Sequence, residues 1–68
     1  MMAREKEMFK KFKFAIEKEY EAYELYKGIA EESSDKKMKM MFEEIASDEL
    51  EHRRKIMAMY KKMKEESL

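Results

Sequence analysis

The chain has 68 residues, and its 16 lysine or arginine residues balance 16 aspartate or glutamate residues, so the formal net charge is zero. Charges of both signs are mixed along the chain, which argues against a nucleic-acid-binding surface, and no apolar run is long enough for a membrane helix. The absence of cysteine excludes disulfides, thiolate metal sites and cysteine nucleophiles. We expect a single small cytoplasmic domain.

The first half of the sequence predicts one long helix. Proline is absent, glycine occurs once and good helix formers dominate, which is an all-α composition. Apolar residues recur at alternating steps of three and four, the period of an amphipathic helix. The resulting seam consists of Phe9, Phe12, Ile16, Glu19, Tyr23, Tyr26 and Ala30. We expect this helix over about residues 3–32, with Glu19 as the one polar member of its seam.

The second half predicts a matching helix after a short turn. The hydroxyl of Ser33 or Ser34 can cap this helix, and Asp35 suits the positive end of its dipole. The second seam consists of Met38, Phe42, Ile45, Glu49, His52, Ile56, Met59 and Met63. We therefore expect a turn at 33–34 and a helix over about residues 35–65. Because so short a connection makes two helices antiparallel neighbours, residues 1–68 should form a single α-hairpin.

Both helices carry more apolar surface than one partner helix can cover. The additional residues are Met8, Ala15, Ala22, Leu25 and Ile29 beside the first seam, and Met41, Ala46, Met57 and Tyr60 beside the second. Stripes this broad suit a four-helix bundle, and two hairpins related by a two-fold axis supply four helices. The sequence therefore predicts a homodimer, or a larger homo-oligomer of such dimers.

Three ionisable residues interrupt the two seams. Glu49 and His52 are three residues apart and project from one helix face, and Glu19 lies at nearly the same depth from the turn. An unpaired buried carboxylate costs roughly several kcal/mol, and a bound dication would compensate that cost. A dimer would supply four carboxylates and two imidazoles, the ligand set of di-iron and di-manganese carboxylate proteins. Such donors suit iron or manganese better than structural zinc.

Two other interpretations of these residues stay open. They can form a buried ion pair or a hydrogen-bonded polar layer that sets the register of the bundle. A different helix phase would instead turn Glu19 outward, beside Glu17 and Glu21. The chain would then be a non-catalytic helical oligomerisation module. A third alternative is a metal-binding protein without turnover.

Residues 15–56 resemble the rubrerythrin-like branch of the ferritin-like superfamily. In that family a ligand glutamate is followed seven residues later by an aromatic residue, as Glu19 is followed here by Tyr26. The family's second motif, LA-x-x-E-x-x-H, is matched by the stretch IASDELEH, residues 45–52. Full-length members carry two such helix pairs. This chain has one, and in this it is similar to half-ferritins, including encapsulated ferritins, whose di-iron site forms between subunits.

The resemblance implies oxidation of Fe(II) by O2 or peroxide, a ferroxidase or peroxide-scavenging activity. It implies two iron ions per dimer, with manganese or zinc as alternatives. By this analogy Glu49 bridges the metals, Glu19 and His52 are terminal ligands, and Tyr26 orients a ligand by a hydrogen bond. The cysteines with which rubrerythrin delivers electrons are missing, so a peroxidase would need an external electron donor. The similarity to encapsulated ferritins implies an encapsulin shell as partner and compartment.

Overall fold

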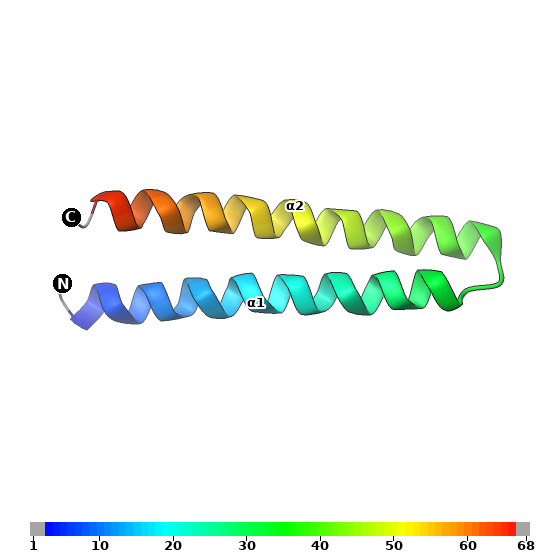
Figure 1. Ribbon diagram of the computed structural model, residues 1–68, viewed down its shortest axis with the longest axis horizontal. Helices are drawn as coiled ribbons and strands as arrows, with labels where there is room; N and C mark the ends of the chain where they lie inside the picture. The colour runs from blue at the N-terminus through cyan, green and yellow to red at the C-terminus, as the bar shows by residue number, and fades with distance from the viewer. Residues whose placement is uncertain (1–2, 67–68) are drawn as a thin grey trace.

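The computed structural model describes residues 3–66, which form two helices, α1 (Ala3–Glu32) and α2 (Lys36–Glu66). The helices run antiparallel and side by side, with the start of α1 and the end of α2 at the same end of the rod (Figure 1). The rod measures 51 × 16 × 10 Å. The predicted all-α antiparallel hairpin is confirmed, and the helix limits differ from the expected ones by at most one residue. Residues 1–2 and 67–68 of the expected unit lie outside the described residues.

Neither of the two described helices is long and apolar enough to cross a membrane.

The end of α1 is set by its last turn and by Ser33. Glu31 and Glu32 place negative charge where the helix dipole is already negative, which disfavours continuation of the helix. The Ser33 hydroxyl donates to the carbonyl oxygen of Ile29 over 2.7 Å, and its amide donates to that of Ala30 over 3.2 Å. These bonds satisfy two carbonyl groups that the helix end would otherwise leave unpaired.

Asp35, and neither serine, is the residue that caps α2. Its carboxylate oxygen Oδ1 accepts a hydrogen bond from the Lys37 amide over 3.2 Å, and its carbonyl accepts one from the Lys39 amide over 2.9 Å. This is the bonding pattern of a helix N-cap. The prediction that Ser33 or Ser34 caps the second helix was wrong, because the Ser33 hydroxyl bonds back to α1.

The seam predicted for α1 faces α2 as expected. Each of its residues is buried or half-buried. Near the open end, the Phe9 ring meets the Tyr60 ring edge to face, with centroids 5.4 Å apart. Near the turn, the rings of Tyr26 and Phe42 stack with centroids 6.2 Å apart. Aromatic contacts therefore hold the two helices together toward both ends of the rod.

The seam predicted for α2 was wrong at every second position. The residues that pack toward α1 are Phe42, Ala46, Glu49, Arg53, Ile56, Tyr60 and Met63. Met38, Ile45, His52 and Met59, spaced seven residues apart, are exposed, and we call them the exposed column. The apolar stripe of α2 spans three adjacent columns of residues seven apart. α1 covers two of them and leaves the exposed column uncovered.

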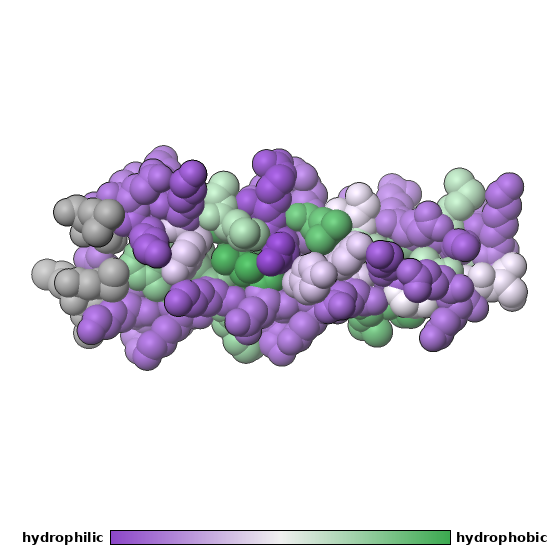
Figure 2. All heavy atoms as spheres, viewed as in Figure 1, coloured by the Kyte–Doolittle hydropathy of each residue, from purple (hydrophilic) through white to green (hydrophobic). Residues whose placement is uncertain are grey.

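One hairpin buries little hydrophobic surface. Among the described residues, only Phe9, Ala30 and Ala46 are buried, while the exposed column leaves Met38 48% and Met59 52% exposed. Hydrophobic side chains gather in the groove between the helices, and hydrophilic ones cover most of the visible face (Figure 2). A core this small rarely stabilises a fold by itself.

Candidate metal centre

Glu19, Glu49 and His52 meet near the middle of the rod. α1 supplies Glu19, and one face of α2 supplies Glu49 and His52, where the cyan part of α1 lies beside the yellow part of α2 (Figure 1). One donor atom from each side chain lies within 4.8 Å of the other two. The Nδ1 atom of His52 lies 3.5 Å from Oε2 of Glu19. The structure thus brings together the three residues that interrupt the sequence pattern.

The Glu19 carboxylate carries the clearest sign that a positively charged group belongs here. Its Oε2 atom is buried and accepts no hydrogen bond from any described residue. A buried acceptor without a partner costs about 1–3 kcal/mol, so native proteins rarely keep one without a reason. The nearby imidazole does not supply this hydrogen bond. A cation bound at Oε2 would satisfy the atom.

The Glu19 carboxyl group raises the pKa of Glu49. The largest cause is the hydrogen bond that a protonated Glu49 can make with Glu19, and partial desolvation and the negative charge of Glu19 raise this pKa further. His52 acts in the opposite direction. Two carboxylates at one site cannot both ionise freely without a nearby positive charge. A divalent cation would take the place of the proton on Glu49 and allow both groups to stay charged.

The donor chemistry fits iron, manganese or zinc. Two carboxylate oxygens and one imidazole nitrogen are typical ligands of these ions, whereas calcium and magnesium prefer oxygen alone. The small side chains of Ala15, Ala22 and Ala46 lie within about a turn of Glu19 or Glu49 along their helices. The His52 side chain is 56% exposed, so the cluster opens onto the face that carries the exposed column.

Tyr26 lies about two helical turns after Glu19 and makes no hydrogen bond to the cluster. Its half-buried ring stacks on Phe42, and its hydroxyl makes no hydrogen bond to Glu19, Glu49 or His52. The predicted role of Tyr26 in orienting a metal ligand therefore stays a prediction.

Arg53 lies at the same depth in the rod as the Glu19–Glu49–His52 cluster, and the sequence pattern did not single it out. It lies on the true seam of α2, directly after His52, and its guanidinium carbon lies 5.0 Å from the centre of the Tyr20 ring. Its Nε atom is buried without a hydrogen-bond partner among the described residues. The spacing Glu49, Arg53, Ile56 and Tyr60 would have revealed it, had the seam of α2 been placed one column over.

Comparison with protein families identifies the class. The Rubrerythrin family model matches residues 10–68, which is most of the chain. The chain therefore belongs to the rubrerythrin family, as its motifs predicted. Membership implies iron and suggests a di-iron carboxylate protein, and the Glu19–Glu49–His52 cluster is a candidate site for it. No curated protein and no solved structure gives a significant match.

Proposed function

We propose that two copies of this hairpin form a dinuclear iron centre that oxidises Fe(II) with O2 or peroxide. The observation that carries the proposal is the convergence of Glu19, Glu49 and His52 around the unpartnered Oε2 atom of Glu19. One hairpin supplies only three donors, and these open onto an exposed face. A second copy related by a two-fold axis would double the donors to four carboxylates and two imidazoles.

The surface for this second copy is the face that carries His52. Counted at about 3.6 residues per turn, the exposed column lies on the same side of the hairpin as one column of α1. That column consists of Met8, Ala15, Ala22 and Ile29. Its two alanines are small, so another helix can approach closely at the depth of Glu19. Pairing through this face would bury apolar surface and bring two clusters together.

In the proposed centre, Glu49, Glu19 and His52 of both chains would hold the two irons, with Glu49 as the bridging ligand and Glu19 and His52 as the terminal ligands that the family resemblance implies. Iron, when bound, would supply the two electrons that, together with two protons, reduce O2 to H2O2, or H2O2 to two H2O. The four carboxylates balance the charge of two dications, and Tyr26 holds a ligand in place. A peroxidase cycle needs an external electron donor, and an encapsulin shell is a further proposed partner.

A second candidate function rests on the exposed column. This apolar stripe also fits a non-catalytic helical oligomerisation module, in which Glu19, Glu49 and His52 form a polar layer that sets register. A metal-binding protein without turnover is the intermediate case. The three candidates differ in metal stoichiometry and in the response to an oxidant.

Anaerobic titration with Fe(II), followed by air or peroxide, separates the three. We expect saturation at two irons per dimer and a new near-UV absorption band on oxidation. Glu49→Ala should abolish the oxidation, while the matched variant Glu43→Ala, at an exposed position on the same helix, should behave as wild type.

Saturable binding without oxidation would leave a metal-binding protein without turnover. No saturable binding, with an unchanged oligomer, would leave the oligomerisation module. Oxidation by Glu49→Ala at the wild-type rate would place the site elsewhere.

A further inference from the structure

The open end of the hairpin carries a groove that the metal centre does not use. Two cavities, of about 350 and 560 Å³, share Tyr60 and Lys64 and so adjoin one another. The first is lined by Lys6, Phe9, Lys10, Lys13, Tyr60 and Lys64, and the second by Ile16, Arg54, Met57, Ala58, Tyr60, Lys61 and Lys64. We call them together the basic groove. It lies on the flank of the seam opposite the exposed column, so the proposed dimer leaves it uncovered.

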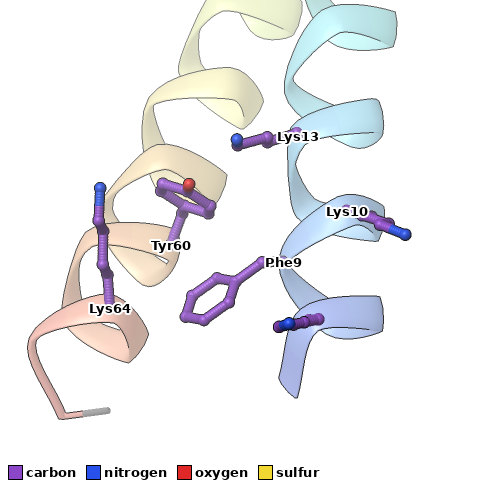
Figure 3. Close-up of a pocket in the computed structure, with 6 residues that line it drawn as sticks. Phe9, Lys10, Lys13, Tyr60 and Lys64 are labelled. Atoms are coloured by element: carbon purple, nitrogen blue, oxygen red, sulfur yellow. The ribbon is translucent and has the colours of Figure 1, made fainter. Parts of the chain in front are cut away.

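The floor of the basic groove is apolar and its rim is cationic. Phe9 and Tyr60 point toward each other between the helices, and the Lys13 side chain extends toward α2 beside them (Figure 3). Lys64 runs along α2 on the other side of Tyr60 (Figure 3). Lysine stems pack against apolar surface while their ammonium groups stay in water. The recess beside these two rings can therefore accept an apolar group, and lysine ammonium groups surround it.

The charge of the groove is unbalanced within the chain. No carboxylate lines either cavity. Lys10 is paired with Glu7 and Arg54 with Glu51, but Lys6, Lys13, Lys61 and Lys64 form no ion pair with any described carboxylate. In a chain of zero net charge, this is a local excess of positive charge at one end. A partner of opposite charge would be attracted to it.

We propose that the basic groove docks an acidic peptide segment of a partner protein through one hydrophobic side chain. Charge complementarity selects an acidic partner, and the apolar floor selects a segment with a hydrophobic anchor. The groove extends from α1 to the far side of α2. An extended peptide can contact its whole length, whereas a compact anion can contact only part of it. The floor is recessed between two helices, where one side chain reaches it and the surface of a bilayer does not.

A synthetic peptide with four glutamates on each side of one phenylalanine is the direct test. Titration of this peptide into the isotopically labelled protein should shift the amide signals of Phe9, Lys13, Tyr60 and Lys64. The signals of Met40 and Met41, beside the cavity at the turn end, should stay in place. The affinity should fall at least about tenfold from low to high salt, because the attraction is between exposed charges.

Variants separate the groove from general charge attraction. Lys13→Glu with Lys64→Glu should lower the affinity at least about tenfold, the loss expected when attraction becomes repulsion. The matched control, Lys36→Glu with Lys37→Glu, makes the same change in net charge at the exposed turn end and should bind as wild type. A peptide with alanine in place of phenylalanine should bind at least about tenfold more weakly, since it lacks the anchor.

Three results would overturn the proposal. The first is no binding of the phenylalanine peptide at low salt. The second is equal loss in both double variants, or equal binding of the alanine peptide, since either shows charge attraction without an anchor. The third is binding to vesicles of phosphatidylserine that Lys13→Glu with Lys64→Glu abolishes, combined with no peptide binding, since the groove would then contact a membrane. Circular dichroism of each variant verifies that the hairpin is folded.

Discussion

At the scale of single residues, Glu49 connects the stability of the fold with the candidate metal site. The neighbouring Glu19 carboxyl group raises the pKa of Glu49, and the same two groups are candidate metal ligands. Any change that removes the negative charge of Glu49 should therefore help the metal-free fold and harm the metal site. This opposition is typical of functional sites, where buried charge is kept at the expense of stability.

Glu49→Gln should stabilise the chain in the presence of a chelator. The raised pKa of Glu49 means that the folded state holds this proton more tightly than the unfolded state. The contribution of this protonated carboxyl group to the free energy of unfolding is fully present below the ordinary carboxyl pKa of 4.5. It is lost as the pH rises through the raised pKa of Glu49. The glutamine should gain about 0.5 kcal/mol over wild type at neutral pH and almost nothing in acid, the scale of a partly exposed charge interaction.

Urea unfolding at several pH values measures this difference, with Glu43→Gln as the exposed control. A stability gain that is independent of pH, or one shared by the control, would contradict the coupling between Glu49 and Glu19.

His52→Ala should weaken binding of Fe(II) or Mn(II) by at least about tenfold at neutral pH. Only a neutral imidazole binds a metal, so the loss should shrink as the pH falls and the wild-type histidine becomes protonated. Calorimetric titration at two pH values gives both affinities. An identical loss at both pH values would show that His52 is not a ligand.

The sequence alone predicted the three candidate ligands, because each is an ionisable residue in an otherwise apolar pattern. It did not reveal Arg53, because the predicted seam of α2 ran through His52 and missed the column of Ala46, Arg53 and Tyr60. In the structure, Ala46 and Tyr60 face α1. Arg53 lies seven residues from each of them and therefore faces α1 as well.

At the scale of the elements, the connection between the helices is held by side chains on both sides of it. Ser33 bonds to the last turn of α1 and Asp35 caps the first turn of α2, so the three residues 33–35 suffice to reverse the direction of the chain. Helix limits were predictable because an apolar pattern stops where a polar cluster begins. The capping residue was not, because Ser33, Ser34 and Asp35 are all good caps and only the geometry of the turn decides among them.

Asp35→Ala should lower the free energy of unfolding by about 1 kcal/mol, because the Lys37 amide loses its acceptor. Thermal unfolding at fixed protein concentration measures the change. Ser34→Ala, at the neighbouring exposed position, is the control and should be nearly neutral. If Ser34→Ala destabilised the hairpin more than Asp35→Ala, the N-cap would have been assigned to the wrong residue.

At the scale of the whole molecule, the hairpin has two different flanks. One carries the exposed column with His52, and the other carries the basic groove. The sequence predicted an excess of apolar surface but not its division between an intrachain seam and a second face. The apolar stripe of α2 spans three adjacent columns of residues seven apart, and the sequence pattern does not state which two of them pack on α1.

Ile45→Lys should convert the proposed dimer into monomers, because the lysine would place a charge in the apolar face beside His52. Met40→Lys is the matched control, since Met40 is 61% exposed and points away from both flanks. Sedimentation equilibrium should give twice the chain mass for wild type and control, and the single mass for Ile45→Lys. A monomeric wild type would contradict the shared centre.

Convergence of donors from two chains on two cations can be observed by anomalous diffraction from crystals grown with Mn(II), recorded at the manganese absorption edge. We expect two peaks close together across a two-fold axis, each contacted by Glu19, Glu49 and His52, with Glu49 between them. Peaks absent from this cluster, or a single ion bound within one hairpin, would contradict this arrangement.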